Sequence, residues 1–290
     1  MSQCESCGSS GTCGGSCPSQ EQKLTEAQEN THIKNIIVVM SGKGGVGKSS
    51  FSSILAIALK NRGFKVGLMD GDITGPSIPK LFGVEGQPQM GAHGIDPIES
   101  DFGISLMSMN FLLPHDDDPV VWRGPIVSGV LTQFFTDVCW GDLDYLVVDL
   151  PPGTGDVPLT IMQDMRVGGA LIVTTPQSLS NMVVRKGIKM LEMMKIPALG
   201  IAENMSYVRC SGCNERINVF GESHVNETCE QFDIPLIGQF PIDPKLSEMG
   251  DAGKIEAYDG EVLTLMTEKL DQILEGLENS IQEEPESAEE

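Results

Sequence analysis

Basic residues are scarce in this chain. Its 290 residues include 19 Lys and Arg against 41 Asp and Glu, which gives a formal net charge of −22 at pH 7. So acidic a surface repels the phosphate backbone of nucleic acids and anionic lipid headgroups, since both are bound by clustered Lys and Arg. We therefore expect neither nucleic acid nor a membrane as a partner.

Long apolar runs are also missing. No run approaches the roughly 18 residues of a membrane span, and the first 20 residues lack the apolar core of a signal peptide. A cytoplasmic location is therefore expected. Thiols stay reduced there, so closely spaced members of the eight cysteines are better interpreted as metal ligands or redox centres than as disulfides.

The chain divides by composition into three parts. Residues 1–31 are rich in Gly, Ser, Gln, Glu and Cys and have almost no large apolar residue, so this segment is expected to be flexible unless a bound metal orders it. Residues 32–279 are expected to form one domain, and the acidic residues 280–290 a disordered tail.

Apolar runs alternate with helical patterns along the expected domain. Strand-like runs lie at 36–40, 66–69, 145–150, 170–174 and 199–204, and helical spacing at 49–59, 183–194 and 263–277. This alternation is typical of βαβ units. It predicts an α/β fold with a doubly wound, mostly parallel sheet.

Residues 42–49 read Gly-Lys-Gly-Gly-Val-Gly-Lys-Ser, a complete G-x-x-x-x-G-K-S/T phosphate loop between a predicted strand and a predicted helix. In such a loop, backbone N–H groups and the helix N-terminus surround the phosphates, Lys48 neutralises them and Ser49 binds magnesium. The sequence therefore predicts a nucleoside triphosphate with Mg²⁺. The predicted nucleotide-binding residues of the loop are Gly42, Lys43, Gly44, Gly45, Val46, Gly47, Lys48, Ser49 and Ser50.

Three carboxylates come at the ends of predicted strands. Asp149 is expected to hold magnesium through water, together with Ser49 and Asp70. Asp72 is expected to orient the attacking water and, with Lys43 and Lys48, to form the catalytic set, because phosphoryl transfer is catalysed mainly by positioning and charge. The alternative for Asp70 and Asp72 is a purely structural turn or helix cap.

The extra lysine at position 43 gives the loop the pattern K-G-G-x-G-K-S/T, which resembles the deviant Walker A family of MinD, the arsenical-pump ATPase and the nitrogenase iron protein. The resemblance implies a P-loop NTPase of the SIMIBI or MinD-like type. It also implies that Lys43 reaches across a homodimer to the partner's nucleotide, so that ATP holds two copies face to face. The alternative is a solvated loop lysine.

The base is expected to be adenine, because no N-K-x-D guanine-reading motif occurs in the chain. Asn204 lies where related ATPases place an adenine-binding asparagine, and Asp243 lies on a later loop that is often near the base. Both residue types also favour turns for their own reasons.

Two groups of cysteines have ligand spacing. The first group is Cys4, Cys7, Cys13 and Cys17. The second is the pair Cys210 and Cys213, which is expected deep in the ATPase body. One pair cannot complete a four-thiolate site, but two pairs in the implied homodimer can hold one [4Fe-4S] cluster between them. Zinc suits four thiolates as well, and a redox pair is a third interpretation, although no helical pattern starts at Cys210. Cys139 and Cys229 are expected to be small buried residues.

Further motifs narrow the resemblance. The phosphate loop, residues 70–77, 122–125, 149–156 and 175–177, and the C-x-x-C pair are similar to those of the Mrp/ApbC/NUBP iron-sulfur carrier ATPases over residues 33–277. The amino-terminal cysteines resemble a branch with C-x13-C-x2-C-x5-C. Only Cys4, Cys7 and Cys13 match that spacing, so Cys17 must serve if four ligands are needed. Arg123 is a candidate for contact with the partner or the nucleotide.

This resemblance implies a scaffold and carrier. The homodimer would assemble a [4Fe-4S] cluster on Cys210 and Cys213 and transfer it to apo iron-sulfur proteins, with ATP binding and slow hydrolysis controlling its geometry. One alternative is an ATP-gated electron-transfer reductase like the nitrogenase iron protein, whose cysteines would lie far apart. Another is a MinD-like regulatory ATPase, zinc-binding or membrane-bound, although the carboxy-terminal helix is too acidic for an anionic membrane.

Overall fold

A mostly parallel sheet forms the centre of the protein in a computed structural model that describes residues 25–72, 75, 77–112 and 124–282. The parallel strands stand in the order β4-β2-β5-β1-β6-β7-β9, and the short β3 and β8 pair antiparallel at the ends. The strands are β1 (His32–Ser41), β2 (Val66–Asp70), β3 (Ile98–Glu99), β4 (Ser105–Ser108), β5 (Asp142–Asp149), β6 (Gly169–Thr174), β7 (Ala198–Arg209), β8 (Arg216–Ile217) and β9 (Leu236–Pro241).

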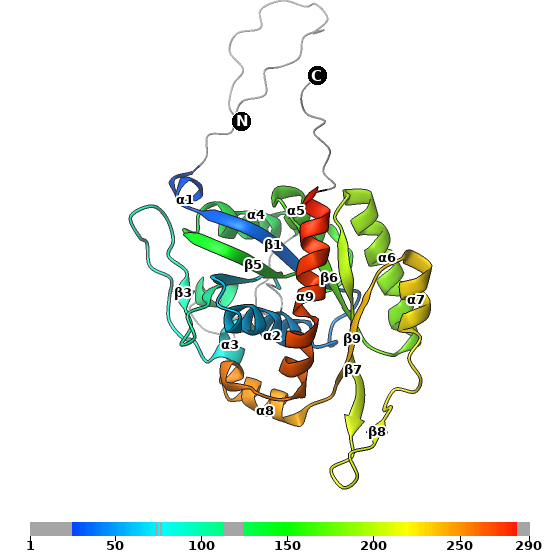
Figure 1. The fold of residues 1–290 in the computed structure, drawn as a ribbon. Helices are drawn as coiled ribbons and strands as arrows, with labels where there is room; N and C mark the ends of the chain where they lie inside the picture. Colours follow the sequence, from blue (N-terminus) through cyan, green and yellow to red (C-terminus); the bar gives the residue numbers. More distant parts are fainter. Residues whose placement is uncertain (1–24, 73–74, 76, 113–123, 283–290) are drawn as a thin grey trace, which may run out of the picture.

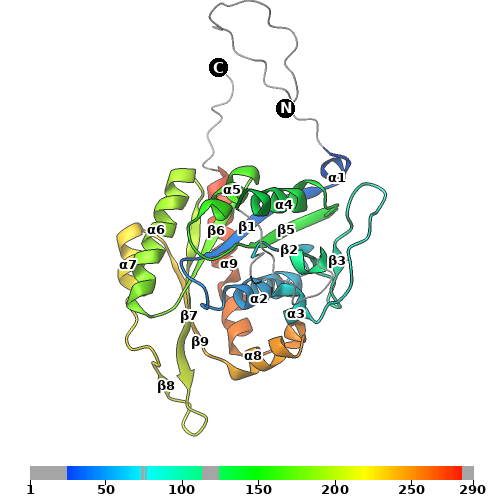
Figure 2. The same cartoon turned by 180° about the vertical axis from the view of Figure 1, so that it is seen from behind.

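Helices cover both faces of the sheet (Figure 1 and Figure 2). On one face lie α2 (Lys48–Asn61), α3 (Ile78–Phe82), α8 (Pro244–Asp251) and α9 (Glu261–Gln282). On the other lie α4 (Gly124–Thr136), α5 (Asp156–Asp164), α6 (Ser178–Met194) and α7 (Val225–Phe232). The remaining short elements are α1 (Glu26–Glu29), η1 (Met109–Leu112) and η2 (Ile255–Ala257).

The two hydrophobic cores follow from the period of a strand. In β1, Ile37 and Val39 point into the core under α2 and α9, while Ile36 and Val38 point into the core under α4 and α6. Because both faces are covered, a continuous apolar run is what such a strand needs. The predicted doubly wound, mostly parallel sheet is confirmed.

The element boundaries differ from the prediction in three places. β7 continues past the predicted end at residue 204 to Arg209, because its last residues leave the main sheet and pair with β8. α9 spans Glu261–Gln282 and so extends beyond the predicted helical spacing of 263–277 at both ends. Residues 26–29, within the segment expected to be flexible, form α1, which begins with a capping box between Thr25 and Gln28 and buries Ala27.

The final helix, α9, packs against α2 and β9. The predicted apolar spacing is confirmed, since Met266, Leu270, Ile273 and Leu277 are almost completely buried. Among the helices of the described ranges, none is long and apolar enough to cross a bilayer.

The substitution Leu270→Ala is expected to lower the free energy of unfolding by about 2–5 kcal/mol, because it removes a fully buried side chain and leaves a cavity between α9 and the sheet. Urea denaturation followed by circular dichroism measures the change. Glu275→Ala, on the exposed face of the same helix, should change stability by no more than about 0.5 kcal/mol. Equal effects of the two substitutions would contradict the packing described here.

Candidate functional site

The phosphate loop joins the end of β1 to the start of α2. Gly45 and Gly47 both have φ of 77°, in the left-handed region that favours glycine. A Cβ atom on Gly47 would lie 2.4 Å from Nδ2 of Asn204, and one on Gly42 would lie 2.5 Å from Cγ1 of Val183. The loop therefore needs glycine both for its backbone conformation and for its close packing.

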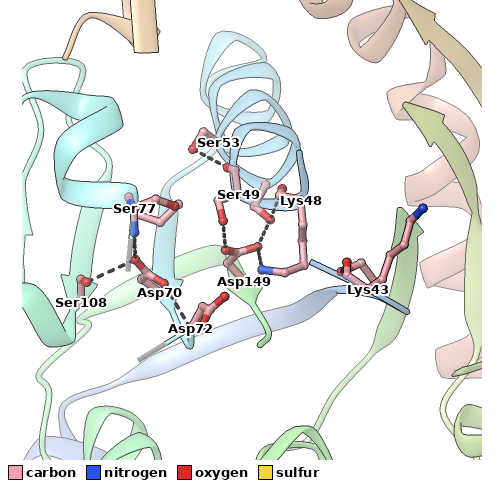
Figure 3. Close-up of polar contacts among 12 residues, drawn as sticks. Lys43, Lys48, Ser49, Ser53, Asp70, Asp72, Ser77, Ser108 and Asp149 are labelled. Atoms are coloured by element: carbon pink, nitrogen blue, oxygen red, sulfur yellow. Dashed lines mark hydrogen bonds and ion pairs between the residues drawn. The ribbon is translucent and has the colours of Figure 1, made fainter. Parts of the chain in front are cut away.

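A buried cluster lies beside the loop (Figure 3). Lys48 Nζ is 2.8 Å from Oδ1 of Asp149, with only 6% of the lysine side chain exposed and none of the aspartate. Ser49 Oγ donates to Asp149 Oδ2 at 2.6 Å, and Ser52 Oγ lies 2.7 Å from Oδ1. Beyond this ion pair, the ammonium group has no aligned hydrogen-bond acceptor among the described residues. A buried ammonium with unused donors at a helix N-terminus fits a phosphate ligand.

Asp70 lies beside Asp149, because the two residues are opposite each other in the parallel pairing of β2 and β5. It is fully buried and accepts hydrogen bonds from the backbone N–H groups of Asp72, Ser77 and Ile78. Ser108 Oγ donates to the same carboxylate at 3.2 Å. The cap expected as the alternative for Asp70 is thus present, and the same geometry leaves two carboxylates together at the sheet edge.

Burial, and secondarily the charge of Asp149, raises the pKa of Asp70 from 3.8 to about 7. The backbone donors and Lys48 oppose this rise. Two adjacent buried carboxylates need more positive charge than Lys48 alone supplies if both are to ionise together. Carboxylate and hydroxyl oxygens are the ligands that Mg²⁺ prefers, so Ser49, Asp70 and Asp149 fit the predicted magnesium site. Asp72 follows on the same loop and is half-buried.

Lys43 points away from these carboxylates (Figure 3). Its Nζ donates to Oε1 of Gln177 at 2.5 Å, and Gln177 is the residue that precedes α6. Within one chain, Lys43 therefore does not share the cluster of Lys48. Its expected reach to a partner stays a prediction.

The two residues expected near the base lie in different surroundings. Asn204 Nδ2 donates to the backbone oxygen of Val46 at 2.9 Å, so this side chain touches the phosphate loop itself. Asp243 accepts from the backbone N–H of Lys245 at 2.9 Å as the N-cap of α8, and from the hydroxyl of Tyr258 at 2.5 Å. Both oxygens of Asp243 thus have structural partners. The role of each residue toward a nucleotide stays a prediction.

Cys210 and Cys213 lie on a turn between β7 and β8, on a hairpin that projects from the body (Figure 1 and Figure 2). This corrects the expectation that the pair lies deep in the ATPase body. Cys210 N donates to Glu215 O at 2.9 Å and Asn214 N to Cys210 O at 2.8 Å, which closes the turn. Backbone N–H groups of Cys213 and Gly212 face the Cys210 sulfur and lower its pKa. The turn therefore favours the thiolate, which is the form that binds metals.

Within the described residues, this turn carries two thiols, Cys210 and Cys213. Cys213 is exposed, and its Sγ lies 3.9 Å from an oxygen of Glu215. No group of three or more His, Cys, Asp or Glu side chains that could hold a metal ion occurs in the part of the chain that the structure describes. No helix starts at Cys210, as expected. Cys229 is buried as predicted, whereas Cys139 is only half-buried.

Several predicted residues lie outside the described ranges. These are Cys4, Cys7, Cys13, Cys17 and Arg123. Sequence reasoning also missed contributors to the cluster. Ser52 was within reach of such reasoning, because it stands three residues after Ser49 on the same helix face, whereas Ser108 and Gln177 come from distant segments.

The comparisons with known proteins agree with this geometry. A ParA family model described as the NUBPL iron-transfer P-loop NTPase matches residues 32–277. The chain belongs to this family. It is 47% identical to the iron-sulfur cluster carrier protein of Methanocaldococcus jannaschii over 254 residues, which cover 87% of this chain and 88% of that protein. It is 42% identical to the carrier protein of Clostridium perfringens over 275 residues, or 90% and 96% of the two chains.

Solved structures support the fold. A nucleotide-binding protein of Archaeoglobus fulgidus, in complex with ADP, superposes with a TM-score of 0.74 at 43% identity over 83% of this chain and 96% of that one. The cell-division ATPase MinD of Pyrococcus furiosus superposes with a TM-score of 0.62 at 21% identity over 83% and 99%. The expected MinD-like P-loop NTPase fold and the expected iron-sulfur carrier family are both confirmed.

The substitution Lys48→Met is expected to weaken binding of MgADP. A charge-assisted hydrogen bond contributes about 1.5–3 kcal/mol, or roughly 10- to 100-fold in Kd. Isothermal titration calorimetry measures the change, and a melting curve checks that the variant is folded. Lys60→Met, at the other end of α2, serves as the control and should bind like the natural chain. Unchanged affinity for MgADP in Lys48→Met would show that Lys48 does not bind the phosphates.

Asp70 should make the nucleotide-free and Mg²⁺-free protein less stable as pH rises. Its raised pKa means that, between about pH 4 and 7, the folded chain holds a proton that the unfolded chain has lost. This stabilisation is complete below the unfolded pKa and disappears as pH passes the folded value, with a slope of at most about 1.4 kcal/mol per pH unit. Asp70→Asn should flatten the pH dependence of the urea midpoint. Asp251 is an exposed carboxylate on α8, so Asp251→Asn should leave this pH dependence unchanged. Parallel curves for all three proteins would refute this.

Proposed function

We propose that this protein is an ATP-dependent iron-sulfur cluster carrier. The observation that supports this most is the hairpin that presents two thiols, Cys210 and Cys213, outside a P-loop body whose family transfers iron. A resident structural metal would need a closed set of ligands within the chain. A pair on a projecting turn, with Cys213 exposed and Cys210 half-buried, is instead suited to a cargo that must be received and released.

The nucleotide is ATP with Mg²⁺, in keeping with the ADP bound by the related protein of Archaeoglobus fulgidus. The loop residues 42–50 and Lys48 hold the phosphates, while Ser49, Asp70 and Asp149 hold the magnesium. Asp72 orients water, and Asn204 and Asp243 lie toward the base. Slow hydrolysis follows if the attacking water is positioned only in one arrangement of the subunits.

The cargo is a [4Fe-4S] cluster held between two copies of the chain. Four thiolates complete its ligand set, and each copy supplies Cys210 and Cys213. Lys43 gives the nucleotide control over this arrangement, because leaving Gln177 for the partner's phosphates replaces a neutral acceptor by a charged one. The cluster is then retained only while the two copies keep their four thiolates together. Apo iron-sulfur proteins receive it when the interface loosens.

The amino-terminal cysteines, Cys4, Cys7, Cys13 and Cys17, form a second metal-binding segment in this proposal. The acidic surface is consistent with a cytoplasmic protein that avoids nucleic acids and membranes. An electron-transfer reductase like the nitrogenase iron protein is less well supported. In that protein the ligands are expected on separate loops, whereas here both thiols share one turn.

Replacing Cys210 and Cys213 by Ser should remove the cluster from the body of the protein. The measurement is iron, sulfide and zinc per subunit after anaerobic reconstitution. Both the natural sequence and a variant with Ser at the four amino-terminal cysteines should be used, so that the two groups are counted separately. In the latter background, we expect iron and sulfide to fall to the level of the blank.

The control is Cys139→Ser, which removes a half-buried thiol that belongs to no group of three or more potential metal ligands among the described residues. It should retain the iron and sulfide of its background. Full iron in the protein without Cys210 and Cys213, or zinc in place of iron in the unmodified protein, would contradict the carrier proposal.

A further inference from the structure

One strand, β7, touches both the phosphate loop and the cysteine hairpin. Near its middle, Asn204 donates to the backbone oxygen of Val46, and its amide nitrogen lies where a Cβ atom on Gly47 would be only 2.4 Å away. The strand ends at Arg209, immediately before Cys210. A shift of the loop therefore acts directly on the strand that carries the thiols.

The strand is bent between these two ends. Met205 has φ of 58°, in the left-handed region, and the pairing of β7 with β9 changes register between Glu203 and Tyr207. A residue other than glycine in this conformation costs about 1–3 kcal/mol and persists only where its surroundings hold it. The bend is thus held by its surroundings and not by the intrinsic preference of its backbone, so its geometry depends on the contacts around it.

Glu203 holds the bend from three sides. Its buried carboxylate accepts from Ser206 Oγ at 2.8 Å, from Gln239 Nε2 on β9 at 2.9 Å, and from Ser223 Oγ at 2.6 Å. Ser223 lies on the segment that returns from the hairpin to α7. Both legs of the hairpin therefore meet at the residue next to Asn204.

At the end of β7, just before the cysteine turn, the hairpin is fixed to α9. Arg209 makes two hydrogen bonds with Glu261, from Nε at 2.6 Å and from Nη2 at 2.5 Å, and the Tyr207 hydroxyl donates to the same carboxylate at 3.0 Å. The guanidinium groups of Arg209 and Arg216 lie 5.5 and 4.3 Å from the centre of the Tyr207 ring. Bidentate pairing and stacking give this anchor a defined geometry.

We infer that β7 couples nucleotide binding to the order of the cysteine turn, with Asn204 and Glu261 as positioning residues. This inference rests on the proposed function, in which Cys210 and Cys213 hold the cargo. A nucleotide that fixes the phosphate loop also fixes Asn204 and the bend next to it. The turn, held at Arg209 by Glu261, then opens less often, and its two thiols are presented in one arrangement.

Hydrogen–deuterium exchange of the iron-free full chain, with and without MgADP, tests this coupling. MgADP should slow exchange at residues 42–49 and also at residues 207–217, where Cys210 and Asn214 donate the bonds that close the turn, by at least about threefold. Asn204→Ala and Glu261→Gln should abolish the response at 207–217. Glu261→Gln should keep the response at 42–49, because the described contacts of Glu261 are with Tyr207 and Arg209.

Glu268→Gln, an exposed carboxylate on the same helix, is the matched control and should behave like the natural chain. Repeating the measurement at tenfold lower protein concentration separates coupling within one chain from burial in a dimer. If Glu261→Gln is unfolded, exchange is also fast in β5. Asn204→Ala then decides, at an MgADP concentration that still slows residues 42–49 in this variant.

The inference is overturned if MgADP leaves residues 207–217 unchanged in the natural chain, or slows them equally in the folded variants. Because no iron is present, such a result leaves the carrier proposal standing. The iron content of the variants without Cys210 and Cys213 tests that proposal separately.

Discussion

The pairing of β2 with β5 is the constraint on which the candidate site depends. It sets Asp70 opposite Asp149 at the end of two buried strands, and the pairing of β1 with β5 brings the phosphate loop beside them. Lys48 and the hydroxyl groups of Ser49 and Ser52 then compensate for the burial of Asp149. Removal of a single partner leaves a buried charge without compensation. These side chains therefore form a unit and not a set of independent contacts.

Local patterns were enough to predict the fold and the phosphate loop. Fully buried parallel strands are continuous apolar runs, and the loop must use glycine where φ is positive or packing is tight, so both leave a direct trace in the sequence. The position of Asp149 followed from the end of such a run. Ser108 left no such trace, since only the folded sheet brings it to the site. Gln177 belongs to the motif at residues 175–177, but that motif did not indicate its contact with Lys43.

The cysteine pair shows where sequence reasoning stopped. Its spacing indicated a shared metal site, and the pair was expected within the body. It lies instead on a hairpin beyond residue 204, where the predicted strand ended. The extension of the strand is held against α9 because Tyr207 and Arg209 bond to Glu261, and these contacts join residues 54 and 52 positions apart. A pattern with a period of two or 3.6 residues contains no information about such contacts.

The anchor between Arg209 and Glu261 has a consequence for the newly made chain. The cysteines leave the ribosome well before the start of α9, so for an interval the hairpin exists without the helix that fixes its base. Until translation reaches that helix, the bond from Arg209 to Glu261 cannot form. A chain that captured metal during this interval would do so before the contact that holds the end of β7 is in place.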